Sequence, residues 1–162
     1  MKKLYLIIGG IVVLAIVGFI AKGLIFGALT GGHYQQNLNG TQTYSNNEGS
    51  VTVGNNASMP SEWPSDAPSN FAGGSIVFSG NSNPQTGKNG AVVSYTVKGG
   101  TIQGVSDYYK AQLTANGWTL QGNYNVAGQG VLAAQKDGRT FGVSISDSGN
   151  GSVTVTAGLE LQ

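Results

Sequence analysis

The sequence predicts an α+β protein in which an N-terminal transmembrane helix precedes a small antiparallel sheet packed on one helix, in the order β-β-α-β-β-β-β. Three observations predict this class. Residues 4–21 of the 162-residue chain are apolar and carry no charge. Beyond residue 71, several stretches alternate apolar and polar residues, as half-buried strands do. Residues 102–116 instead place their apolar residues at helical spacing.

The first predicted element is a signal anchor over residues 1–31. The 18 residues of the apolar run would span about 27 Å as a helix, close to the roughly 30 Å of a bilayer's hydrocarbon core. Lys2 and Lys3 place the N-terminus in the cytoplasm, and everything after residue 31 outside it. A cleaved signal peptide is the alternative, but its apolar region usually has only about 7 to 15 residues. The expected anchor positions are Leu4, Ile8, Val13, Ile16, Phe19 and Lys22, the lysine lying at the outer interface.

Three glycines at the outer end of this segment, Gly23, Gly27 and Gly31, form two overlapping G-x-x-x-G spacings. Such spacing lets two membrane helices approach closely, so it predicts helix self-association. The alternative is that these glycines have no such role, because glycine is common in membrane helices.

Residues 32–59 are polar and show no helical periodicity, which predicts a flexible tether. Val51 and Val53 could form a brief strand there, but we expect them to have no structural role in the tether. Residues 60–70 contain three prolines, which favour extended backbone, and Trp63, which is too large an apolar surface for a loose tether. This segment is predicted to be a strap that docks Trp63 on the folded domain; the alternative is a Trp63 exposed to a partner or to the membrane.

The folded domain is predicted over residues 71–162. Its helix should begin after Thr101, bury Val105, Tyr109 and Leu113, and end before Gly117, which suits a left-handed position. The strands expected around it are residues 75–79, 91–98, 118–126, 131–136, 140–146 and 153–161.

Two features of these strands can be tested against the structure. Asp137-Gly138 predicts a tight hairpin turn, because this pair tolerates positive φ. In residues 118–126 the alternation places four apolar side chains on one face of the sheet. These are Trp118, Leu120, Tyr124 and Val126.

The helix-to-strand stretch resembles a family signature, FY-x-x-x-L-x-x-x-GW, with tyrosine here at the phenylalanine position. Its residues in this chain are Tyr108, Tyr109, Leu113, Gly117 and Trp118. The upstream PSDAP of residues 64–68 is similar to the entry of the same domains, which are small extracytoplasmic domains of bacterial membrane proteins and lipoproteins. The resemblance implies a location in the cell envelope and a fold, and no activity. The signature also has a purely structural explanation in packing and helix termination.

The composition of the chain argues against most kinds of catalytic, metal-binding and nucleic-acid-binding site. The chain has no cysteine, so thiolate metal sites have no material, and its one histidine, His33, leaves almost none for a Ser-His-Asp triad or a multi-histidine metal site. Its net charge of +1 gives no basic surface for nucleic acid. The turn at Asp147–Gly151 lacks the alternate acidic ligands of a calcium loop. We expect no catalytic residues, no metal and no cofactor.

These expectations describe a non-enzymatic, single-pass, membrane-anchored module of a bacterial cell envelope, periplasmic or on the cell surface. Its partner would be an envelope protein or glycan. The candidate contact residues are Trp63, in its exposed alternative, and Tyr108, for which the alternative is a partly buried tyrosine at the edge of the core. The alternative function is a structural subunit whose copies form a homo-oligomer through the membrane helix or the sheet edges.

Overall fold

The computed structural model describes residues 32–82, 89–126 and 128–161. The predicted signal anchor, with the membrane positions from Leu4 to Lys22 and the three glycines of the G-x-x-x-G spacings, lies outside the described residues. Across those described ranges, no helix is long and apolar enough to cross a membrane.

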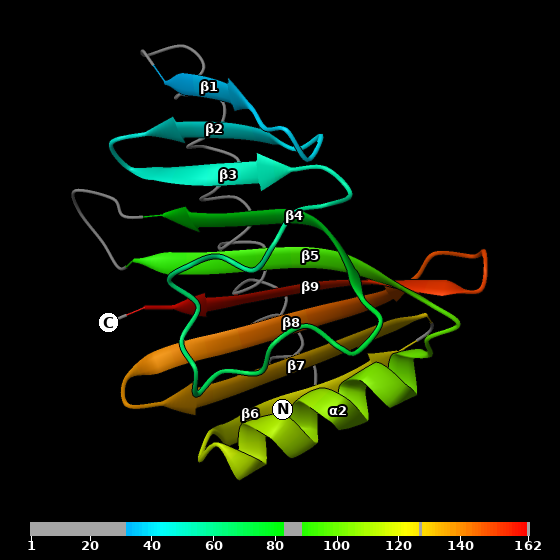
Figure 1. The fold of residues 1–162 in the computed structure, drawn as a ribbon. Coiled ribbons are helices and arrows are strands. Elements are labelled where there is room, and N and C mark those ends of the chain that lie inside the picture. The colour runs from blue at the N-terminus through cyan, green and yellow to red at the C-terminus, as the bar shows by residue number, and fades with distance from the viewer. Residues whose placement is uncertain (1–31, 83–88, 127, 162) are drawn as a thin grey trace.

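Within the described residues, nine strands form one antiparallel sheet (Figure 1). Its spatial order is β1-β2-β3-β4-β5-β9-β8-β7-β6, so β9 inserts between β5 and β8 at the centre. The strands are β1 (His33–Gln36), β2 (Gln42–Asn46), β3 (Gly49–Val53), β4 (Ser75–Ser82), β5 (Gly90–Lys98), β6 (Thr119–Val126), β7 (Gln129–Lys136), β8 (Arg139–Asp147) and β9 (Ser152–Glu160). From β4 onward, the order with helix α2 is the predicted β-β-α-β-β-β-β.

Helix α2 (Ile102–Ala115) confirms the predicted caps and buried face. The Thr101 hydroxyl accepts a hydrogen bond from the Gly104 amide at 3.0 Å, which satisfies one of the free N–H groups of the first turn. Tyr109 and Leu113 are fully buried. After the helix, the Trp118 amide donates to the Leu113 carbonyl at 2.9 Å across Gly117, whose φ is +77°.

A Gly117→Ala substitution should therefore lower the free energy of unfolding by about 1 kcal/mol, because alanine disfavours a left-handed backbone. No atom lies within 4 Å of the Cβ it would add, so the cost comes from the backbone alone. Gly117→Asn should cost less, since asparagine tolerates this conformation. Urea unfolding of the three proteins checks the ranking, and equal stability of alanine and asparagine variants would contradict it.

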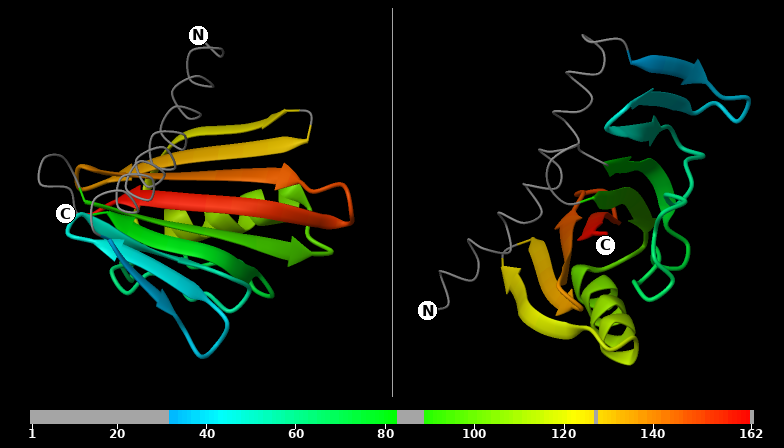
Figure 2. Two further views of the ribbon diagram at one scale, coloured as in Figure 1. Left: turned by 90° about the horizontal axis from the view of Figure 1, so that it is seen from above. Right: turned by 90° about the vertical axis from the view of Figure 1, so that its left-hand side faces the viewer.

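The core lies between α2 and one face of the sheet, which we call the inner face. The strap, residues 60–70, lies on the same face, so that α2 and the strap cover one side and leave the opposite, outer face to the strands alone within the described ranges (Figure 2). Alternate residues of the central strands point inward. They include Val93, Tyr95, Leu132, Phe141, Val143, Ile145, Val155 and Leu159, each fully buried.

The prediction of a flexible tether over residues 32–59 is wrong, because this segment forms β1, β2 and β3 and extends the sheet. β3 pairs with β4 in antiparallel register, so a strand already fixed by the core provides a template for it. Hydrogen bonds between polar side chains replace a hydrophobic core on the inner side. Thr43 and Thr52 hydroxyls lie 3.0 Å apart, and the Ser50 hydroxyl donates to Asn81 Oδ1 at 2.7 Å.

The hairpin turn is confirmed and the β6 pattern is corrected. Asp137 and Gly138 have φ of +50° and +75°, as the Asp-Gly turn requires. In β6, however, a bulge between Leu120 and Gly122 shifts the register. The bulge reverses the alternation, so Tyr124 pairs with Val131 on the outer face instead of sharing the face of Leu120.

Candidate functional site

The strap docks on the core through Trp63, as the sequence predicted. The Trp63 ring meets Phe141 edge-on with centroids 6.3 Å apart, and its indole N–H donates to the Pro68 carbonyl at 3.1 Å. Ala67, also in the strap, is buried. Trp63 is therefore half-buried, with its polar atom satisfied inside the strap.

A second attachment joins the strap to the β7–β8 hairpin by charge. Asp66 accepts two hydrogen bonds from the Arg139 guanidinium, at 3.1 Å and 2.6 Å. It also forms an ion pair with Lys136, whose Nζ lies 2.8 Å from Asp66 Oδ2. The hydrogen bonds from Arg139 and then Lys136 lower the pKa of Asp66 to about 2. Arg139 is 8% exposed, so this pair lies close to the core.

Trp118 completes this attachment. Its indole N–H donates to the backbone carbonyl of Asp66 at 2.6 Å, and the Arg139 guanidinium lies 5.1 Å from its ring centroid. Trp118, at the end of the helix-to-strand stretch, thus binds the PSDAP segment directly through Asp66.

The other aromatic residue predicted at the surface, Tyr108, is half-buried. Its ring packs edge-on between Phe71 and Tyr109, with centroid distances of 5.3 Å to each. Its hydroxyl reaches the Ser69 hydroxyl at 3.3 Å. Together Trp63, Phe71 and Tyr108 pack on the core without being enclosed by it. We call these three side chains the aromatic ridge.

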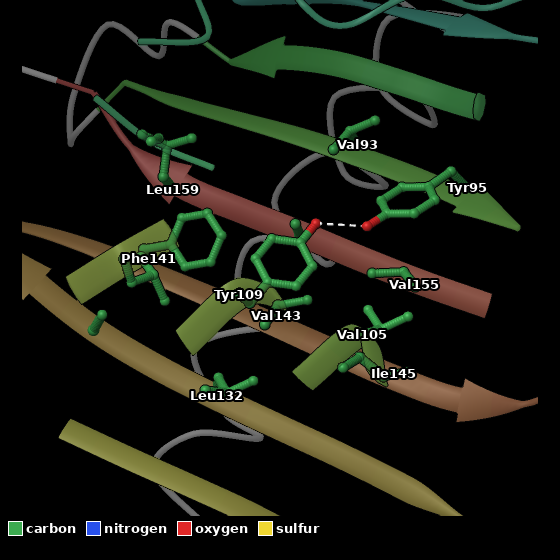
Figure 3. Packing of buried hydrophobic residues seen from close by; sticks show 14 of the residues in the cluster. Val93, Tyr95, Val105, Tyr109, Leu132, Phe141, Val143, Ile145, Val155 and Leu159 are labelled. Carbon is green, nitrogen blue, oxygen red and sulfur yellow. Dashed lines mark hydrogen bonds between the residues drawn. The ribbon is translucent and has the colours of Figure 1, made fainter. Parts of the chain in front are cut away.

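Beneath the ridge, two tyrosines fill the space between helix and sheet (Figure 3). The hydroxyls of Tyr95 on β5 and Tyr109 on α2 lie 2.8 Å apart, and Tyr95 also accepts from the Phe71 amide at 3.0 Å. Burial raises the pKa of Tyr95 to about 12 and that of Tyr109 well above its usual value. The pair is a satisfied polar contact inside the core.

This burial predicts a loss of stability at alkaline pH. Because the folded pKa of Tyr95 is raised from 10.0 to about 12, its contribution of about 3 kcal/mol is present below pH 10 and lost as pH rises towards 12. Urea unfolding at several pH values should show this decline, and a Tyr95→Phe variant should show less of it. A free energy of unfolding that stays constant from pH 10 to 12 would contradict the buried pair.

One depression lies at the start of α2. It has a volume of about 350 Å³ and is open to solvent. Its lining comes from the β5–α2 and β8–β9 connections and the adjoining ends of α2, β8 and β9, and includes three glycines. Its acidic side chain, Asp147, accepts from the Gly149 amide at 2.8 Å. This carboxylate is therefore engaged within its own turn.

No group of three or more metal-ligating side chains occurs in the part of the chain that the structure describes. His33 is exposed on β1, away from the aromatic ridge. Among the described residues, therefore, the hydroxyl of Ser69 beside Tyr108 has no histidine near it with which to form a catalytic triad. Sequence reasoning missed the Asp66–Arg139 pair. The two residues are 73 positions apart, and only the family-like PSDAP segment singled out Asp66.

The comparisons with known proteins supply one match. Residues 77–156, just under half of the chain, match the model of a family described as START domain-like. The match begins within β4, includes α2 and ends within β9, and its description names neither the helix-to-strand signature nor a membrane anchor. No curated protein and no solved structure matches the chain. Within its described residues the chain forms an antiparallel sheet with one helix, an α+β arrangement that is START-like over residues 77–156.

Proposed function

We propose that this protein is a non-enzymatic binding or accessory module, anchored in the membrane of a bacterial cell by its N-terminal segment, with the folded domain outside the cytoplasm. The observation that carries the proposal is the uncharged apolar run of residues 4–21, preceded by Lys2 and Lys3. The START-like match is in keeping with a ligand-binding module.

The anchoring is tested by the position of the domain relative to the membrane. Leu38 is fully exposed, at 109% relative accessibility, so a cysteine placed there would be accessible. It would also be the only thiol of the chain. In intact cells stripped of any outer layer, a membrane-impermeant maleimide should label this cysteine as fully as after lysis. Labelling only after lysis would overturn the proposed orientation. Release of the protein by alkaline carbonate would overturn the anchor.

The aromatic ridge is the surface that supports binding best. Aromatic faces stack on sugars and on peptide groups, and the three rings of the ridge are only partly buried where they pack on the core. The neighbouring hydroxyl of Ser69 adds a polar group next to Tyr108. An envelope glycan or protein segment therefore fits its chemistry, whereas charged ligands would find few charged residues, only 9% of the chain.

Fluorescently labelled soluble peptidoglycan fragments provide the probe. Binding followed by fluorescence polarisation should weaken about tenfold in Tyr108→Ala, the loss of one stacked ring. Tyr124→Ala is the matched control, because Tyr124 is a half-buried tyrosine on the outer face. No binding to the parent protein, or equal weakening in both variants, would overturn the ridge as a glycan site.

A structural subunit is the second candidate, favoured by the open edges of the sheet. β1 pairs only with β2 in the described structure, and all four of its residues are exposed. Such an edge can pair with another copy. The mass of the full-length protein in mild detergent tests this: a defined oligomer that Gly27→Leu reduces would support assembly through the membrane segment, and a monomer would exclude both routes.

A further inference from the structure

The outer face of the sheet carries an apolar cluster that is separate from the main core. Val51 and Val92 are buried in it, and Val53 and Phe78 pack against them. We call these four residues the outer patch. They come from β3, β4 and β5, on the face opposite α2.

Two tyrosines extend the outer patch to the edge of the sheet. Tyr34 on β1 pairs with Tyr44 on β2, which pairs with Val51 on β3. The two rings pack at a centroid distance of 5.2 Å and are 55% and 37% exposed. The row of apolar side chains thus runs from the first strand inward, and its edge residues are still open to contact.

The inner side of β1, β2 and β3, and of the turn between β1 and β2, is polar. Asn37 donates to the hydroxyls of Thr41 and Thr43, at 2.9 Å and 3.0 Å. Thr43 in turn bonds Thr52. Strands β1 to β3 therefore direct their apolar side chains away from α2 and the strap, towards a face over which the described ranges place neither helix nor loop (Figure 2). An apolar sheet face of this kind requires a cover.

The chain itself supplies an apolar segment next to this edge. Residues 23–30, GLIFGALT, continue the apolar run beyond Lys22, although residues 4–21 are long enough to cross a bilayer by themselves. Only two residues, Gly31 and Gly32, separate this surplus from β1. As a helix it would reach about 12 Å, and neighbouring strands lie about 4.8 Å apart, so from β1 it extends over β2 and β3.

We propose that residues 23–30 turn back at Gly31-Gly32 and cover the edge tyrosines and the β3 residues of the outer patch. Leu24, Ile25, Phe26 and Leu29 supply the apolar side chains. The inference rests on the proposed function for the membrane position of residues 4–21. It deepens that function, because a docked segment holds the outer face in a fixed orientation close to the bilayer instead of leaving the domain on a loose tether.

Cysteine crosslinking tests this contact in the full-length, membrane-bound protein. The chain has no native cysteine. Leu24, Ile25 and Phe26 are replaced by cysteine in turn, so that one of three successive helical positions faces the sheet. Each is paired with Tyr44→Cys or Val53→Cys on the outer face, and with Thr43→Cys or Thr52→Cys as matched inner-face controls from the same strands. A short bismaleimide then joins cysteines that lie close together.

The expected result is an intramolecular product that forms several-fold more with an outer-face cysteine than with its inner-face neighbour. A product of twice the monomer mass would show that a second copy covers the patch and would overturn the proposal. Equal yields on both faces, or no product at all, would also overturn it. Carbonate extraction of the same membranes reports separately on the anchor, so crosslinked protein that is released overturns the proposed function and leaves the contact standing.

Discussion

Replacing Phe141 by alanine is expected to lower the free energy of unfolding by about 3 to 5 kcal/mol, the cost of removing a large buried ring. Phe141 is fully buried on β8 and touches three aromatic rings from different parts of the chain. The ring centroids of Trp63, Tyr109 and Trp118 lie 6.3, 5.8 and 5.9 Å from it. The strap, α2 and the connection from α2 to β6 therefore all lose a ring contact with β8 through one substitution.

Because a domain's total stability is about 5 to 15 kcal/mol, the Phe141→Ala protein should unfold at markedly lower urea concentration. Tryptophan fluorescence would report the transition. Leu120→Ala is the control, since Leu120 is 37% exposed on β6, two strands away, and its replacement should cost less than about 1 kcal/mol. Equal effects of the two substitutions would contradict the packing around Phe141.

Asp66→Asn should cost about 2 kcal/mol near neutral pH, with a distinct pH dependence. The folded pKa of Asp66, lowered from 3.8 to about 2, makes its contribution fully present above pH 4 and lost as pH falls towards 2. Arg139, with a side chain 10% exposed, would lose its carboxylate partner. The variant should therefore be less stable at pH 7 and should show a shallower loss of stability between pH 4 and 2.

Asp107→Asn separates this effect from a general loss of negative charge. Asp107 pairs with Lys110 at 3.7 Å on the helix surface, with its side chain 57% exposed. Its replacement should change the free energy of unfolding at pH 7 by less than about 0.5 kcal/mol. If both variants behave alike from pH 7 to 2, the Asp66 attachment does not hold the strap.

Local sequence signals sufficed for the elements around the core. Thr101 and Gly117 fix the ends of α2 because capping and left-handed backbone depend on single residues. The inward face of β9 follows from the strict alternation of apolar and polar residues, because successive side chains of a strand point to opposite faces of the sheet. In β6 the same rule failed after Leu120, because a bulge leaves no signal in hydrophobic periodicity.

The segment before the strap could not be predicted in this way. Residues 32–59 contain too few apolar residues to fold alone, and they form strands because β4 offers them a free edge. Their polar side chains bond to one another across the strands, a pattern that composition does not distinguish from that of a disordered tether.

The candidate site, too, has features that local sequence predicts and contacts that only the tertiary structure shows. The sequence by itself was enough to predict that Trp63 would dock and that Tyr109 and Leu113 would be buried, because each depends on residue type and local spacing. Only the tertiary structure decided that Asp66 would meet Arg139, 73 residues away, and that Tyr95 would bond Tyr109 inside the core. Such pairs form when the antiparallel sheet brings distant strands together, and no periodicity within one element encodes which partner its polar side chain will meet.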